Sequence, residues 1–185
     1  MLYERTLPVA AQFAEELDMT NIHRMMDLGG GSGVMSMALM RRYPQLTSVV
    51  VEIENVCVSG RRIAAENGLS DRITFHPANI LRDELPASFD LVLEADVGLY
   101  ELELFRRVRA ALNPGGRFVI SQPWAQRDGS VPDRLLLRNF RSSLQDPNAL
   151  ECILKDVRAL MREAGFQQLS EWAFGQDDIV LEGRT

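Results

Sequence analysis

The pattern of apolar and polar positions along this chain switches repeatedly between two periods. Short apolar or β-branched runs predict strands at 25–28, 47–52, 72–76, 89–94 and 117–121. Apolar residues spaced by three or four positions predict helices at 7–17, 34–42, 56–67, 102–112 and 149–164. Two further strands are expected at 167–173 and 179–182, and a turn at 113–116.

This alternation of strands and helices predicts an α/β fold. We expect a doubly wound, mostly parallel seven-stranded sheet with helices on both faces and a C-terminal antiparallel hairpin. Such sheets bind ligands beyond the carboxyl ends of their strands. Candidate chemistry is therefore expected in the loops at 29–33, 52–55, 77–80, 94–100 and 122–128.

Length and composition restrict the class of protein. The 185 residues suit a single domain spanning 1–185, in which 1–20 form a leading helix. No apolar run reaches the ~18 residues that a membrane span needs, and the first residues lack the order of a signal peptide. Cys57 and Cys152 match no metal spacing, so we expect reduced thiols, a cytoplasmic location and no metal.

The net charge of −6 argues against a nucleic-acid partner, because phosphate binding needs a basic face. The arginines come in small groups at 41–42, 61–62 and 106–109, each within a predicted helix. Two interpretations remain open for them, solvated helix faces or a local patch for an anion or a partner.

The loop after the first strand carries the strongest motif. It reads DLGGGSG over residues 27–33, which is acidic-x-Gly-x-Gly-x-Gly with Asp27 at its head. Such a glycine density is kept where the backbone needs positive φ or meets a ligand closely. The dinucleotide pattern lacks its last glycine, since Val34 stands there, and no phosphate-binding Gly-Lys-Ser/Thr follows. A cofactor with a charged amino-acid end suits this loop better than a phosphate.

A second acidic residue, Glu52, ends the second predicted strand 25 residues after Asp27. This is near the ~20-residue spacing at which a carboxylate accepts hydrogen bonds from both ribose hydroxyls. A solvated carboxylate at a strand end is the alternative.

Six segments occur in the order of a known family: MMDLGGGSG (25–33), YPQLTSVVVEIENV (43–56), DRITFHPANI (71–80), FDLVLEADV (89–97), NPGGRFVIS (113–121) and AGFQQLSEW (164–172). Together they resemble the Rossmann-like class I S-adenosylmethionine-dependent methyltransferases. Within that class the chain is most similar to the catalytic domain of small-molecule O-methyltransferases related to caffeate and acetylserotonin methyltransferases.

The resemblance implies a cofactor, S-adenosylmethionine, and a set of residues that hold it: Asp27, Gly29, Gly31, Gly33, Glu52, Ile53, Asn79, Ile80 and Glu94. The glycines would cradle the methionine part, and Glu52 the ribose. Asn79 occupies a slot where the family usually has an aspartate facing the adenine amino group, and Ile80 would offer its backbone N–H to the ring.

Three departures from the family leave the catalytic residue unknown. The family's histidine base falls on Leu99, with Tyr100 next, and the histidines of this chain, His23 and His76, are expected to be structural. The family's N-terminal dimerisation domain is not found in 1–185, so the chain would be a stand-alone variant or a fragment. The span between the fifth strand and the last helix, which usually shapes the acceptor pocket, matches poorly.

We therefore expect a methyltransferase acting on a small-molecule acceptor, at oxygen, with Tyr100, Asp96 or the ionised acceptor itself replacing the histidine. Three alternatives stay open. The chain could bind the cofactor without turnover until a partner chain or a second copy in a homo-oligomer completes the site, it could methylate carbon or nitrogen, or it could be another nucleotide-dependent enzyme such as a dehydrogenase.

Overall fold

A computed structural model of the chain describes residues 2–123, 133, 136, 157–176 and 178–185. Its strands are β1 (Arg24–Leu28), β2 (Thr47–Glu52), β3 (Ile73–Pro77), β4 (Phe89–Ala95), β5 (Leu112–Pro123), β6 (Gln167–Phe174) and β7 (Asp178–Arg184). Its helices are α1 (Leu2–Glu16), α2 (Val34–Arg42), α3 (Glu54–Glu66), α4 (Leu102–Ala111) and α7 (Val157–Glu163).

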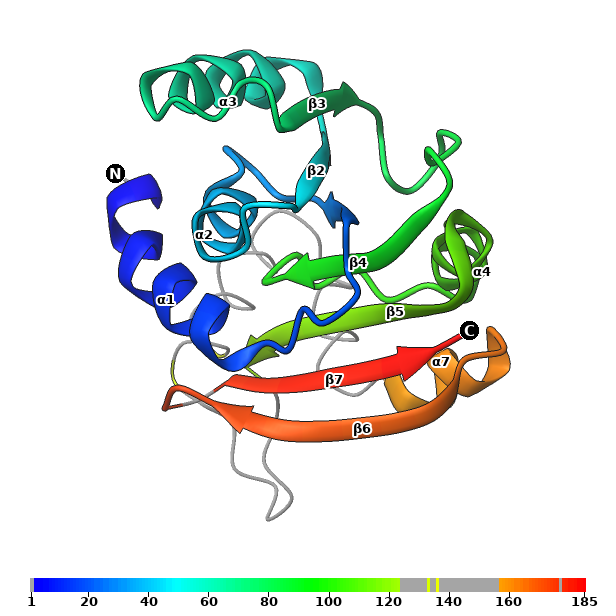
Figure 1. Ribbon diagram of the computed structural model, residues 1–185. Coiled ribbons are helices and arrows are strands. Elements are labelled where there is room, and N and C mark those ends of the chain that lie inside the picture. The colour runs from blue at the N-terminus through cyan, green and yellow to red at the C-terminus, as the bar shows by residue number, and fades with distance from the viewer. Residues whose placement is uncertain (1, 124–132, 134–135, 137–156, 177) are drawn as a thin grey trace.

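The strands form one seven-stranded sheet in the order β3-β2-β1-β4-β5-β7-β6 (Figure 1). β1 to β5 are parallel, and β7 runs antiparallel to both β5 and β6. The predicted α/β fold with a mostly parallel sheet and a terminal hairpin is confirmed. Helices α1, α2 and α3 cover one face, and α4 and α7 cover the other (Figure 1).

Each face of the sheet carries its own apolar core. Neighbouring residues of one strand enter opposite cores, because successive side chains of a strand point to opposite faces. Met25 thus packs with α1 and α2, whereas Met26 packs with α4 and α7. Burial on both faces explains the continuous apolar runs of the central strands, such as Leu91 to Leu93 in β4.

The leading helix is longer than predicted. It begins at Leu2 rather than at residue 7 and contains Pro8 in its interior. Proline removes one intrahelical hydrogen bond, which is why the pattern predicted a start just before it. The buried face formed by Ala10, Phe13 and Ala14 against the first core outweighs that loss.

The turn predicted at 113–116 is wrong as a separate element, because these residues belong to β5. Phe89 pairs with Leu112 and Leu91 pairs with Arg117, so the segment between them is a bulge in the strand. Gly115 takes the positive φ of +76° there. Residues 122 and 123, expected in a loop, also continue β5 and pair with β7.

Several predictions fall outside the described residues. These are Trp124, Phe140, Cys152, the rest of the loop predicted at 122–128, and residues 149–156 of the last predicted helix. Within the ranges that are described, no helix combines the length and the apolar character needed to cross a membrane.

Candidate functional site

Three loops meet at the carboxyl ends of β1, β2 and β3, and Glu52 joins them. The Gly29 amide donates to the Val51 carbonyl at 2.8 Å, and the Gly31 amide donates to the Glu52 Oε2 atom at 3.3 Å. On the other side, the Ala78 amide donates to the Glu52 carbonyl at 3.0 Å. The glycine loop, the end of β2 and the loop after β3 therefore form one continuous surface, as the parallel strands predict.

The glycine loop has left-handed backbone at the three predicted positions, with φ of +67° at Gly29, +57° at Gly31 and +80° at Gly33. L side chains rarely adopt this conformation. A Cβ atom built at Gly31 would have no atom within 4 Å, so the loop leaves open space there. The backbone at Gly31 can therefore meet a ligand closely.

Asp27 lies buried beneath this loop. Its Oδ2 atom accepts a hydrogen bond from Ser36 Oγ at 2.6 Å, and Ser36 Oγ lies 2.8 Å from Ser48 Oγ. Its Oδ1 atom has no hydrogen-bond partner among the described residues. The pKa of Asp27 is raised from 3.8 to about 6 in total. Burial is the largest cause, the Ser36 hydrogen bonds oppose it, and the negative charge of Glu52 adds to it.

Glu52 and Ile53 face the same surface. The Glu52 Oε1 atom accepts the Ile53 amide at 2.8 Å, and each carboxylate oxygen keeps capacity for a further donor. The Ile53 side chain is 54% exposed at the start of α3, an unusual position for a large apolar side chain next to a carboxylate. A flat apolar group bound above it would cover this surface.

The loop after β3 is a compact turn held by its own polar groups. The Asn79 Oδ1 atom accepts the Leu81 amide at 3.0 Å, and the Asn79 amide donates to Asp83 Oδ2 at 2.7 Å. The Arg82 and Asp83 amides both donate to the Asn79 carbonyl. The Asn79 side-chain oxygen thus already has one partner, which leaves less of its capacity for an adenine amino group.

Glu94 organises the loop after β4 from a buried position. Its Oε1 atom accepts the amides of Val97 and Gly98, both at 2.8 Å. Val97 in turn packs against the glycine loop, because a Cβ atom at Gly29 would lie 2.6 Å from Val97 Cγ2. Glu94 therefore shapes the wall of the site through this loop.

The candidate bases near the acceptor side differ in accessibility. Asp96 is exposed at the end of β4, with a left-handed φ of +60°. Tyr100 is only 2% exposed, and its ring lies edge-on to that of Phe105 in the second core. Leu99, where the resemblance implies a histidine, is half-buried against the same core. Packing is thus the role that the structure supports for Tyr100.

The two histidines lie in or next to strands. His23 precedes β1, where its amide donates to Asp90 Oδ2 and its carbonyl accepts from Thr47. His76 lies in β3 and pairs with Val51. In the part of the chain that the structure describes, no group of three or more histidine, cysteine, aspartate or glutamate side chains could hold a metal ion.

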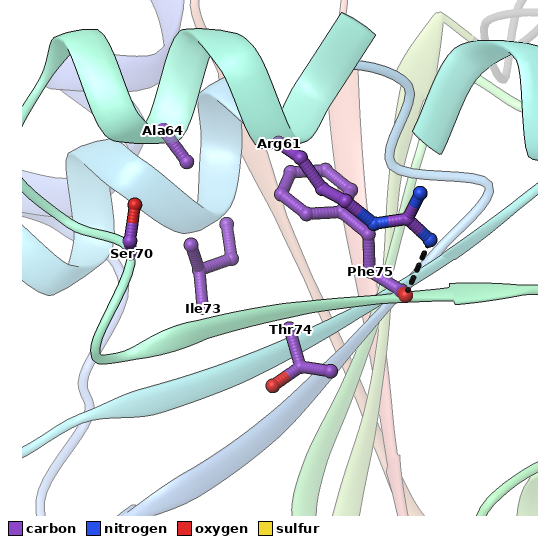
Figure 2. Close-up of a pocket in the computed structure, with 6 residues that line it drawn as sticks. All are labelled: Arg61, Ala64, Ser70, Ile73, Thr74 and Phe75. Carbon is purple, nitrogen blue, oxygen red and sulfur yellow. Dashed lines mark hydrogen bonds between the residues drawn. The ribbon is translucent and has the colours of Figure 1, made fainter. Parts of the chain in front are cut away.

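A separate hollow of about 290 Å³ lies between α3 and the edge strand β3 (Figure 2). Arg61 reaches across it and donates to the Phe75 carbonyl at 3.3 Å, while Ser70 and Ile73 line the other end (Figure 2). None of the predicted cofactor residues lines this hollow. It is therefore not the candidate site.

Sequence reasoning missed several residues that support the site. A Cβ atom at Gly30 would lie 2.3 Å from Asp27 Cγ, so Gly30 is needed to admit the buried carboxylate. The glycine run itself was the signal for that. Ser36 and Ser48, which complete the polar group under the loop, carry no signal in the sequence, because the contact depends on how α2 packs on β2.

Comparisons with known proteins identify the family. A family model described as an O-methyltransferase domain matches residues 3–167. Acetylserotonin O-methyltransferase of Mus musculus is 33% identical over 162 residues, covering 82% of this chain and 41% of that protein. L-tyrosine C(3)-methyltransferase of Streptomyces lavendulae is 33% identical over 123 residues, covering 64% of this chain and 34% of that protein.

Among solved structures, the S-adenosylmethionine-dependent methyltransferase SibL in its apo form superposes with a TM-score of 0.78 at 26% identity. The match covers 99% of this chain and 56% of that one. The chain thus spans about a third to somewhat over half the length of these relatives. By the family model that matches most of its length, the chain belongs to the O-methyltransferase domain family.

Proposed function

We propose that this chain binds S-adenosylmethionine at the carboxyl ends of β1, β2 and β3 and transfers its methyl group to an oxygen atom of a small-molecule acceptor. The observation that carries the proposal is the surface centred on Glu52, in a chain whose residues 3–167 match the O-methyltransferase domain. Family membership supports the reaction class, and the outward-facing groups of this surface support the cofactor.

The residues present fit that cofactor. The open space at Gly31 would admit the methionine part, and the Asp27 Oδ1 atom beneath the loop would attract its ammonium group. Glu52 would accept the ribose hydroxyls. The exposed Ile53 would cover one face of the adenine, and the Ile80 amide would donate to its edge.

S-adenosylmethionine supplies an already activated methyl group, so the main task of the chain is to align an acceptor with it. An exposed carboxylate such as Asp96 could take the proton of a hydroxyl acceptor, whereas the apolar Leu99 cannot. We propose that the acceptor is either ionised before transfer or deprotonated at the exposed side of this loop.

A second candidate function is cofactor binding without turnover by this chain alone. It is favoured by Leu99, which stands where the resemblance implies a histidine. The similarity to an L-tyrosine C(3)-methyltransferase also keeps carbon methylation open as the reaction. A second copy of the chain or a partner chain would then complete the acceptor side.

Calorimetry separates these candidates from a dehydrogenase. We expect heat on titration with S-adenosylmethionine and with S-adenosylhomocysteine, and a higher melting temperature with either ligand. Binding of NAD with no response to the methionine-derived ligands would contradict the proposal. Labelled S-adenosylmethionine with a panel of phenols, catechols and hydroxyindoles then tests turnover, and binding without product supports the second candidate.

Other features of the proposal rest on the sequence. A single domain over 1–185 is supported by the continuous cores, and the acidic composition supports a partner that is not a nucleic acid. A cytoplasmic location is supported by the low cysteine content.

A further inference from the structure

We propose that Arg107 is a positioning residue for the adenine ring, acting through the backbone of the turn after β3 and not by contact with the cofactor. This inference rests on the proposed function and adds to it a residue outside the nine predicted to hold the cofactor. Arg107 lies on α4, far along the chain from the loops of the site.

Arg107 closes the turn with two charged hydrogen bonds. Its Nη2 atom donates to the Ile80 carbonyl at 2.7 Å, and its Nη1 atom donates to the Asp83 carbonyl at 2.5 Å. One planar guanidinium therefore fixes two carbonyl groups three residues apart. The other end of the turn is fixed to β2 through the Ala78 amide and the Glu52 carbonyl.

Within this turn, the backbone amide groups differ in whether they donate a hydrogen bond. The amides of residues 78, 79, 81, 82 and 83 all donate to acceptors in the turn or in β2. Among the described residues, the Ile80 amide has no acceptor, although its own carbonyl is held by Arg107. Since Ile80 is half-buried, this open donor is available to an acceptor atom of a ligand.

The two observations are connected by the rigidity of the peptide. The Ile80 side chain packs toward the second core, which fixes where this residue lies but not how its peptide groups are turned. The Ile80 amide lies in the same peptide plane as the Asn79 carbonyl, which accepts the Arg82 and Asp83 amides. Arg107 holds the next peptide plane and the end of the turn through the Ile80 and Asp83 carbonyls, so the turn that carries this amide is fixed against α4. The free amide is thereby kept in one direction before a ligand arrives.

The neighbouring arginines of α4 show that this role is specific to Arg107. Arg106 forms only an exposed 3.9 Å ion pair with Glu103 on the same helix. Arg109 donates from Nε to the Gly165 carbonyl at 3.1 Å, beyond α7. The arginine group is thus neither a purely solvated face nor an anion patch, since Arg107 and Arg109 bind backbone carbonyls of different segments.

The test compares Arg107→Ala with Arg109→Ala and Arg106→Ala, which remove the same charge from the same helix. The probes are S-adenosylhomocysteine and S-inosylhomocysteine. The latter carries an oxo group in place of the amino group and a hydrogen on the ring nitrogen beside it, so that nitrogen cannot accept an amide N–H. Dissociation constants are measured by calorimetry and unfolding by heat without ligand.

We expect Arg107→Ala to weaken S-adenosylhomocysteine binding by about 10-fold, as for one lost oriented hydrogen bond, while binding of the inosine analogue changes less than about 2-fold. Arg109→Ala should lower the melting temperature without changing either affinity, and Arg106→Ala should change neither. Arg107→Lys keeps one charged donor and should recover part of the preference for the adenine ligand. It also replaces the alanine variant if that variant does not fold.

An equal loss for both ligands, or no loss for either, would overturn the role of Arg107 while leaving the proposed function intact. If the native chain binds neither S-adenosylmethionine nor S-adenosylhomocysteine, the proposed function fails first, and this inference fails with it.

Discussion

The carboxyl edge of the sheet divides into two regions that differ in how far they are open to a ligand. At β1 to β3, Gly31 faces open space and Ile53 is exposed. At the end of β4, Glu94 turns inward to the amides of its own loop, and Tyr100 lies in the core. The first region is open toward a ligand, whereas in the second region Glu94 forms hydrogen bonds within its own loop.

Under the proposed function, the cofactor and the acceptor would bind in these two separate regions. In the region at β1 to β3, backbone contacts arrange the donors and acceptors without a ligand. Binding there should therefore lose little conformational entropy. The loop after β4 contacts it mainly through Val97 at Gly29. Changes in the first region should therefore affect cofactor affinity strongly, and changes in the second should affect it weakly.

The largest effect is expected for Gly31→Val. A branched side chain resists the left-handed backbone and fills the space that the ligand needs, so we expect at least about 100-fold weaker S-adenosylhomocysteine binding. Calorimetry measures the affinity. Gly68→Val is the matched control, because Gly68 has φ of +67° and no atom within 4 Å of a Cβ, but lies at the end of α3 away from the site.

Both glycine variants should lose similar stability from backbone strain, and only Gly31→Val should lose the ligand. Affinity that is unchanged in Gly31→Val, or equally reduced in Gly68→Val, would show that the open region is not the binding surface.

The next effect is expected for Glu52→Gln, which keeps the size of the side chain and removes its charge. Charge-assisted hydrogen bonds contribute about 1.5–3 kcal/mol, so we expect about 10- to 100-fold weaker binding. Glu54→Gln is the control, because Glu54 is an exposed neighbour that pairs with Arg61. A 2′-deoxy cofactor analogue should bind the native chain poorly and lose less in the variant. Equal losses for both ligands would assign Glu52 to folding of the glycine loop instead of the ribose.

The same division explains what the sequence could and could not predict. Elements and their order follow from local periodicity, and the glycine loop and Glu52 are readable because both directly follow apolar strands. The bulge at 113–116 was predicted as a turn, because the sequence Asn-Pro-Gly-Gly favours a turn and a bulge alike. The pairing with β4 is what makes this segment part of a strand.

The supporting residues of the site were not readable for a different reason. Ser36, Ser48 and Arg107 reach their partners through tertiary packing across 9 to 27 positions of the chain. No periodicity or motif encodes such contacts. The acceptor side was predicted least, because the segment expected to shape it carries no motif and lies largely in 124–156, outside the described residues.

For Asp27→Asn the expected effect is on the pH dependence of stability. Because the pKa of Asp27 is raised from 3.8 to about 6, the native chain holds a proton between these values that the unfolded chain has released. The native free energy of unfolding should therefore fall as pH rises from about 4 to about 6, by up to about 3 kcal/mol. The variant should lack this component. Urea unfolding at several pH values across this window measures the difference.

The same carboxylate links pH to binding. An ammonium group near Asp27 favours its ionised form, so native affinity for S-adenosylhomocysteine should rise as pH increases through about 6, and this rise should vanish in Asp27→Asn. A native affinity that does not vary across this range would place the ammonium elsewhere.

The smallest effect is expected for Tyr100→Phe. The ring lies edge-on to Phe105 at a centroid distance of 6.4 Å and is almost fully buried, so the variant should keep its cofactor affinity within about 2-fold and change the free energy of unfolding by less than about 1.5 kcal/mol. If the native chain methylates a phenol, its pH–rate profile should be the same in this variant, and its midpoint should follow the pKa of the acceptor. A midpoint that stays fixed across phenols and moves in Tyr100→Phe would make the tyrosine the base.

Leu99→His complements this test, because a histidine at this position should speed turnover only if the acceptor already binds nearby. General-base help is worth about 10²–10⁴-fold, so a rate that stays low in Leu99→His would show that the region after β4 lacks an acceptor site in this chain alone, as its inward-turned polar groups indicate.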